Sequence, residues 1–197
     1  EEEEERADSQ QVEASTSVTS IPMEKFQDFD FVISNFYTID KTTSINGEQL
    51  NAPELIQKDM HMKTENDQPQ ILIYHSHSQE AFVDSVPGNP ETTIVGAGTR
   101  LASILTDAYG YYVIHVTDTF DIVEGKLDRD KAYSYAQEKI SQVLDENPSV
   151  EVVIDLHRDG VSEDKHLVTV VNGKPTAKIM FFNGLSRTTQ NGDITYL

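Results

Sequence analysis

The segment Ile71-Leu-Ile-Tyr74-His75-Ser-His77-Ser-Gln-Glu80 decides the fold class of this chain. It begins with a short, uninterrupted apolar run, which is typical of a strand buried in a parallel sheet. Two histidines and a glutamate follow the run directly. In an open α/β sheet, side chains just beyond the carboxyl ends of the strands line the ligand crevice. The segment therefore predicts both a buried strand and the first half of a functional site.

Strands and helices are predicted to alternate after this segment. The apolar spacing predicts helices over 93–108, closed by Gly110, and over 128–147. Strands are predicted over 111–116 and 150–156. This order is typical of parallel strands joined by right-handed crossovers. We therefore expect an α/β fold with a mainly parallel sheet flanked by helices.

The chain is expected to divide into three parts. Residues 1–22 open with five glutamates and contain almost nothing to bury, so they are predicted to be a disordered acidic tail. Residues 23–66 are predicted to form an extension packed on the main domain, and residues 67–197 to form the main domain itself.

Further elements are expected in the extension and after the sheet. Residues 29–39 look strand-like, and a short helix is predicted from Asn51 to Met60. A hairpin insertion is predicted from strands 166–171 and 177–182, with its turn at Asn172-Gly173. The sheet then lacks a final helix and strand, so we expect the domain to be incomplete within these 197 residues.

The composition restricts the possible partners and metal ligands. The formal net charge is −19, and no basic stripe is present, which argues against nucleic-acid binding. Cysteine is absent, so His, Asp and Glu are the strong metal ligands available. No apolar run approaches the roughly 20 residues that span a bilayer.

A third histidine follows the last predicted sheet strand, in Asp155-Leu-His157-Arg-Asp159. Imidazole and carboxylate are the ligands of catalytic zinc, and three protein ligands leave a position for water. We favour His77, Glu80 and His157 as ligands of Zn²⁺. His75 is either an alternative ligand or a partner that orients one.

Other polar residues near the strand ends have two interpretations each. Asp155 or Asp159 could accept the second ring N–H of a ligating histidine, or could cap the turn that follows. Arg158 could bind a substrate carboxylate or pair with a nearby acidic side chain. Structural roles are expected for the remaining histidines and for two glycines of the first helix, namely His61, His115, His166, Gly96 and Gly98.

These motifs together resemble those of the stage II sporulation protein P family of cell-wall hydrolases. The resemblance rests on the order and spacing of Ile-Tyr-His75-Ser-His77-Ser-Gln-Glu80-Ala-Phe, Val95-Gly96, Asp155-Leu-His157-Arg-Asp159, Val171-Asn-Gly173-Lys and Ala177-Lys-Ile-Met-Phe. The family is similar in fold to zinc-dependent N-acetylmuramoyl-L-alanine amidases. The resemblance therefore implies an amidase-like fold and cleavage of the amide between N-acetylmuramic acid and the stem peptide. Some members are also credited with cleaving peptide cross-links.

The resemblance also implies a cellular setting and one departure. It implies a role in engulfment during sporulation, with a lytic transglycosylase and a membrane protein as partners. The expected location is extracytoplasmic, at the mother-cell membrane facing the intermembrane space. Amidases of this fold carry a catalytic glutamate on a late strand, in a setting that is not found before Leu197. That glutamate is therefore expected beyond Leu197, and this stretch alone is expected to lack activity.

Two alternatives remain open. A phosphoesterase that uses His-x-His with two metal ions would need Asp155 or Asp159 as a further ligand. A cell-wall or partner-binding module without chemistry would need no metal.

Overall fold

The structure is a computed structural model that describes residues 20–41, 44–162, 165–182, 187–188 and 192–193. The chain separates into two compact units, of which one runs from Met60 to Val161 and contains the sheet. The described residues before Met60 and after Val161 are assigned to the other unit. The predicted acidic tail falls almost wholly on residues 1–19, outside the described residues.

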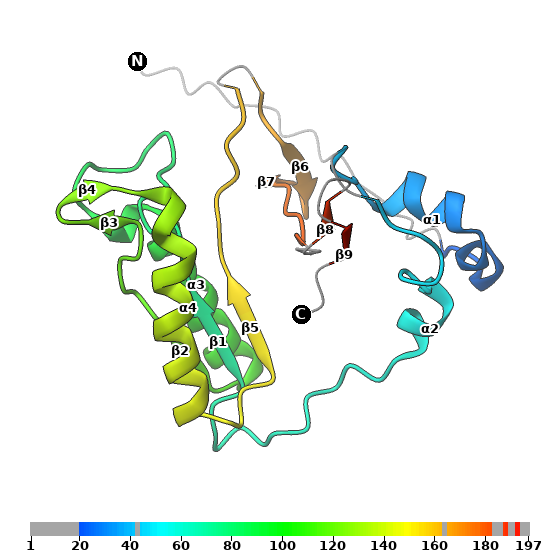
Figure 1. Cartoon of the computed structure of the whole chain (residues 1–197), viewed down its shortest axis with the longest axis horizontal. Coiled ribbons are helices and arrows are strands. Elements are labelled where there is room, and N and C mark those ends of the chain that lie inside the picture. The colour runs from blue at the N-terminus through cyan, green and yellow to red at the C-terminus, as the bar shows by residue number, and fades with distance from the viewer. Residues whose placement is uncertain (1–19, 42–43, 163–164, 183–186, 189–191, 194–197) are drawn as a thin grey trace, which may run out of the picture. The chain divides into compact units, whose positions relative to one another are not determined.

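A three-stranded parallel sheet forms the centre of the 60–161 unit (Figure 1). Its strands are β1 (Ile71–Tyr74), β2 (Val113–His115) and β5 (Val152–Asp155), in the order β2-β1-β5. The register pairs Ile73 with both His115 and Ile154. The predicted mainly parallel sheet is therefore confirmed, and the strand before the histidines lies in its middle.

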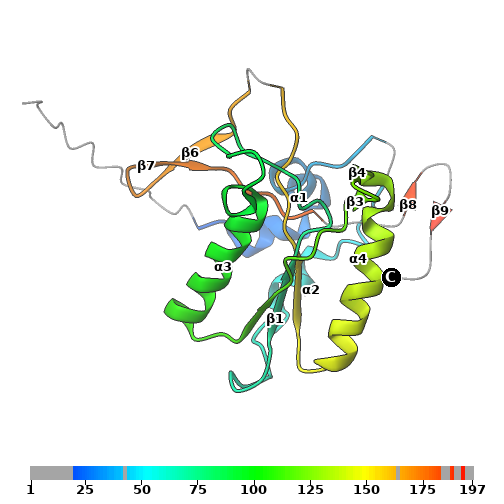
Figure 2. The same cartoon turned by 90° about the vertical axis from the view of Figure 1, so that its left-hand side faces the viewer.

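Two long helices make the crossovers between these strands and cover opposite faces of the sheet (Figure 2). Helix α3 (Ile94–Tyr109) begins at Thr93, whose hydroxyl accepts from the N–H of Val95, and ends at Gly110 in the left-handed conformation with φ of 74°. Helix α4 (Arg129–Glu146) begins at Asp128, whose carboxylate accepts from the N–H of Lys131. Both predicted helices are confirmed to within two residues at each end.

The apolar residues of β1 are shared between the two faces, because side chains alternate along a strand. Leu72 is fully buried on the α4 face. It belongs to a cluster formed by Leu72, Val116, Phe120, Ala136, Ile140 and Val143. Alternation places Ile71 and Ile73 on the α3 face, and both are buried. Burial on both faces explains why this strand reads as a continuous apolar run.

The region before Met60 is helical where a strand was expected. Residues 29–39 were predicted to be strand-like, but Phe29–Phe36 form helix α1. The carboxylate of Asp28 accepts from the N–H of Phe31 at 3.1 Å and caps this helix. The apolar residues Phe29, Val32, Ile33 and Phe36 are also spaced as on one helical face, so the strand prediction was wrong.

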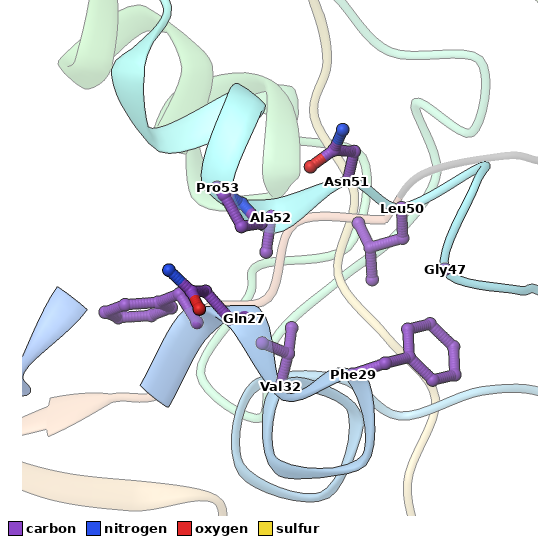
Figure 3. Close-up of a pocket in the computed structure, with 9 residues that line it drawn as sticks. Gln27, Phe29, Val32, Gly47, Leu50, Asn51, Ala52 and Pro53 are labelled. Carbon is purple, nitrogen blue, oxygen red and sulfur yellow. The ribbon is translucent and has the colours of Figure 1, made fainter. Parts of the chain in front are cut away.

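Two short helices accompany α1. They are η1 (Met23–Gln27) and α2 (Ala52–Gln57), and α2 is shorter than the predicted helix. Val32, Leu50 and Ala52 form a small buried cluster. A cavity of about 180 Å³ opens beside this cluster, lined by residues 26–53 alone (Figure 3). None of the candidate site residues belongs to it.

The remaining elements are short. Strands β3 (Ile122–Val123) and β4 (Lys126–Leu127) form a hairpin that the sequence reading missed, and η2 (Pro90–Thr92) precedes α3. Strands β8 (Arg187–Thr188) and β9 (Gly192–Asp193) also pair.

The predicted hairpin insertion is present as β6 (Val168–Val171) and β7 (Lys174–Ala177). Its turn residues Asn172 and Gly173 both have positive φ, as predicted for this pair. The second strand was predicted over 177–182, which was wrong, because a two-residue turn starts it at Lys174. Among the described residues, no helix is both long and apolar enough to cross a membrane.

Candidate functional site

The candidate site is built on the loop that leaves the carboxyl end of β1. Residues 76–79 form a turn instead of continuing the strand. Apart from the exposed Gln79, the loop is buried, with His75 and Ser76 at 0 % exposure and His77 and Glu80 at 6 %. Because of this turn, the side chains of His75 and His77 contact different neighbours.

His75 lies on the α3 side of the sheet, and both of its ring nitrogens have partners. Nδ1 lies 2.9 Å from the carbonyl oxygen of Leu156, and Nε2 lies 2.9 Å from Nε2 of His115. A carbonyl only accepts, so His75 carries its proton on Nδ1 and accepts at Nε2 from His115. Burial lowers the pKa of both histidines. Gly98 packs closely against this pair, in agreement with the structural role expected for this glycine.

His77 lies on the other side, against α4. Its ring meets the rings of Tyr133 and His157 edge-on, with centroids 5.0 and 5.2 Å away. Its Nδ1 is buried and has no hydrogen-bond partner. Burial, followed by the charge of Arg129, lowers the pKa of His77. His77 therefore stays neutral and offers an unpaired ring nitrogen.

His157 follows β5 and is oriented from β1 and β5 together. Its Nε2 lies 3.0 Å from Oδ2 of Asp155 and 3.1 Å from Oγ of Ser76. Ser76 also donates to Asp155 through its N–H at 2.9 Å and its hydroxyl at 2.8 Å. The strand register places Asp155 beside Tyr74, directly before this loop. Of the two aspartates considered, Asp155 contacts His157, and Asp159 is exposed.

The Asp155–His157 pair shifts the pKa of both groups. Burial alone would raise the pKa of the Asp155 carboxyl, but hydrogen bonds from His157 and Ser76 outweigh burial and lower it. The same bond to Asp155 raises the pKa of His157, although burial opposes this. The Nε2 proton is therefore fixed toward Asp155, and Nδ1 is the ring nitrogen left facing Glu80.

Glu80 is held by three neighbours. Its Oε1 accepts from Nη2 of Arg129 at 2.8 Å, and its Oε2 accepts from the backbone N–H of Arg158 at 2.6 Å. Nδ1 of His157 lies 3.6 Å from Oε2. Arg158 was expected to act through its side chain, but it contacts Glu80 through its backbone.

Three residues of this arrangement were missed by sequence reasoning, namely Ser76, Arg129 and Tyr133. Ser76 lies between the two histidines of the loop, and its role depends on the register with β5. Arg129 and Tyr133 come from the start of α4, whose placement over this end of the sheet is a tertiary feature. No sequence signal marks them.

His77, Glu80 and His157 are chemically suited to bind zinc. His77 has a buried ring nitrogen without a hydrogen-bond partner, and Nδ1 of His157 lies beside the carboxylate of Glu80. Each oxygen of Glu80 also keeps an unused lone pair. Among the described residues, no three His, Asp or Glu side chains stand close enough together to form a complete metal site as placed. Binding of an ion would therefore require a local shift of these side chains.

Comparison with known proteins connects this site to a family. The chain is similar to the stage II sporulation protein P of Bacillus subtilis (strain 168), with 23 % identity over 137 residues. This match covers 65 % of the chain and 34 % of the relative, so the chain spans about a third of that protein's length. No solved structure matches the chain significantly.

The sequence model of the family described as stage II sporulation protein P (SpoIIP) matches residues 1–193. That range includes both the loop after β1 and the segment after β5. Because the match extends over nearly the whole sequence, the chain belongs to the stage II sporulation protein P family.

Proposed function

We propose that the chain carries the metal-binding part of a zinc-dependent peptidoglycan hydrolase. The bond cleaved would be the amide between N-acetylmuramic acid and the stem peptide, with peptide cross-links as a second substrate. Family membership supports the coarser statement of a role in sporulation connected with the cell wall. The observation that carries the finer proposal is that His157, after β5, lies beside both His77 and Glu80 of the loop after the neighbouring strand β1.

In this proposal His77, Glu80 and His157 hold the zinc ion. When bound, zinc would supply Lewis-acid activation of water and of the scissile carbonyl. Asp155 and Ser76 hold one ring proton of His157 on Nε2, so Nδ1 is the nitrogen that would bind the metal, in exchange for any proton that the raised pKa leaves on it.

Glu80 serves as a ligand in the proposal, and Arg129 holds its carboxylate in place. Another residue must therefore act as general base. The glutamate expected on a late strand remains a prediction for that role.

The wider setting belongs to the same proposal. We propose that the protein acts in engulfment, at the mother-cell membrane facing the intermembrane space. Its proposed partners are a lytic transglycosylase and a membrane protein of the same process.

The test is the zinc content of the purified chain and of three histidine variants, measured by elemental analysis after dialysis. We expect about one zinc ion per wild-type chain, as for a mononuclear hydrolase site. His77→Ala and His157→Ala should lose the metal. His166→Ala is the matched control, because His166 is exposed and lies outside the 60–161 unit, and it should keep the metal. A folded wild-type chain without zinc would favour the non-catalytic binding module instead.

A further inference from the structure

The loop that carries His77 and Glu80 is held by the buried carboxylate of Asp121. Asp121 is 0 % exposed. Its Oδ1 accepts from the hydroxyl of Ser78 at 2.7 Å, and its Oδ2 accepts from the N–H of Gln79 at 3.1 Å. Both donors lie between the two candidate ligands in the sequence. Asp121 therefore fixes the part of the loop that sets the distance between those ligands.

Burial of a carboxylate is unfavourable unless hydrogen bonds or a cation compensate for the lost hydration. Among the ion pairs of the described residues, none involves Asp121. Its compensation comes from donors of the loop, and charge-assisted bonds of this kind are stronger than neutral ones. The buried carboxylate therefore needs the donors of the loop, and the loop needs the carboxylate to keep its conformation.

Asp121 also connects the loop to the start of α4. Its carbonyl oxygen accepts from the N–H of Asp128 at 2.8 Å, which closes the β3–β4 hairpin. Asp128 caps α4, and the next residue, Arg129, returns to Oε1 of Glu80 at 2.8 Å. Hydrogen bonds thus link Gln79 to Asp121 and Arg129 to Glu80, and the β3–β4 hairpin connects Asp121 to Arg129.

We propose that Asp121 is a positioning residue for metal binding, which holds His77 and Glu80 in place through Ser78 and Gln79. This inference rests on the proposed zinc site. Asp121 itself would not contact the metal. It acts on the backbone and on the serine hydroxyl between the ligands, as the outer partners of metal ligands do elsewhere.

The experiment compares Asp121→Ala, Asp121→Asn and Ser78→Ala with the wild-type chain. Zn²⁺ affinity is measured by competition with a chromophoric chelator, and Co²⁺ loading gives a visible spectrum that reports ligand geometry. Asp121→Ala should weaken Zn²⁺ binding by about 10- to 100-fold, as loss of an outer partner does. Ser78→Ala removes one of the two bonds and should show a smaller loss and an altered Co²⁺ spectrum.

Asp121→Asn is the rescue variant. Its amide oxygen can accept from the N–H of Gln79, and its amide nitrogen can donate to the hydroxyl oxygen of Ser78. Both links survive without the charge, so its Zn²⁺ affinity should stay within about threefold of wild type, well short of the loss expected for Asp121→Ala.

Gln70→Ala is the matched control for a loss of stability alone. Gln70 is 5 % exposed at the opposite end of β1, and its side chain bonds to Thr64 and Tyr112. The variant should lower the melting temperature of the metal-free chain and leave Zn²⁺ affinity unchanged.

Several outcomes would overturn the inference. Wild-type affinity in Asp121→Ala would do so, as would losses in Asp121→Ala and Gln70→Ala that simply follow their melting temperatures. An Asp121→Asn variant as weak as Asp121→Ala would show that charge matters rather than positioning. If Asp121→Ala does not fold, the Zn²⁺ affinities of Ser78→Ala and Asp121→Asn still test the inference. A wild-type chain that binds no Zn²⁺ removes the proposed function, and the role of Asp121 with it.

Discussion

At the scale of single residues, His75 and His77 differ in what their ring nitrogens already contact. Both nitrogens of His75 are used, one by Leu156 and one by His115. His77 has a buried Nδ1 without a partner. These contacts favour His77 over His75 as the proposed zinc ligand. His75 instead joins β1, β2 and β5 at their carboxyl ends.

The two histidines should therefore respond differently to substitution by glutamine. His75→Gln breaks buried hydrogen bonds and should lower the free energy of unfolding of the metal-free chain by about 1–3 kcal/mol. It should leave Zn²⁺ affinity nearly unchanged. His77→Gln should lower Zn²⁺ affinity by at least about 100-fold, beyond the range for outer partners. Urea unfolding and chelator competition measure the two effects, and a loss of metal confined to His75→Gln would reverse the assignment.

The His75–His115 pair also predicts a pH dependence. Burial lowers the pKa of both histidines in the folded chain. Below the ordinary histidine pKa of about 6.5, these two residues therefore bind more protons in the unfolded chain than in the folded chain. Stability from this pair is therefore present above about pH 6.5 and is lost as pH falls toward the folded pKa values. Each group contributes a slope of at most about 1.4 kcal/mol per pH unit.

The test measures urea unfolding of the metal-free chain between pH 5 and 7.5, with His115→Gln as the variant. Glutamine can still donate to Nε2 of His75 but does not titrate, so the variant should lose less stability at low pH. His157, whose pKa is raised, contributes with the opposite sign in both proteins and cancels in the comparison. Equal slopes in the two proteins would contradict the prediction, and His166→Ala should keep the wild-type slope.

The sequence was sufficient to place the candidate ligands at one edge of the sheet, because polar residues after buried parallel strands must lie there. Their role as ligands stays a prediction. The sequence could not find the residues that hold those ligands. Asp121 and Arg129 lie more than 40 positions from the groups they bond, as the sequence separations of 43 and 49 show. Their side chains reach the loop only because α4 and the β3–β4 hairpin pack beside it.

At the scale of elements, the prediction succeeded where burial is two-sided and failed where the apolar pattern is short. The continuous apolar run of β1 and the long periodic segments of α3 and α4 were recognised. The segment Phe29–Phe36 has apolar residues compatible with both periods, and a single capping contact from Asp28 accompanies the helix. In short segments of this kind, periodicity alone cannot separate strand from helix.

Helix α3 provides a test of how tightly the elements pack around the histidine pair. A Cβ atom at Gly98 would lie 2.5 Å from Nε2 of His75 and 2.7 Å from Nε2 of His115. Alanine favours a helix over glycine by about 1 kcal/mol, but overpacking typically costs about 1–3 kcal/mol. Gly98→Ala should therefore lower the free energy of unfolding in urea.

The matched control is Thr106→Ala at an exposed position of the same helix, which should raise stability by a few tenths of a kcal/mol. If Gly98→Ala raised stability as the control does, the close packing of α3 on the pair would be refuted.

At the scale of the whole molecule, the candidate ligands and the residues that hold them all fall within the 60–161 unit. The unit also contains the segment that leads into β1. Glu151 accepts from the backbone N–H groups of Lys63 and Thr64 and ties this segment to the start of β5. The site therefore depends on contacts made inside one unit.

A fragment of residues 60–161 should consequently fold and bind metal without the rest of the chain. A unit of about 100 residues is large enough to bury a core of its own, and its apolar cluster is formed from β1, α4 and the segment after β2. We expect a single cooperative urea transition, and Zn²⁺ affinity within about threefold of the whole chain because no candidate ligand or outer partner is removed. The same fragment with His157→Ala is the control and should bind no zinc. A fragment that folds but loses zinc, while the whole chain retains it, would show that a ligand comes from outside residues 60–161 and that the His77, Glu80 and His157 assignment is incomplete.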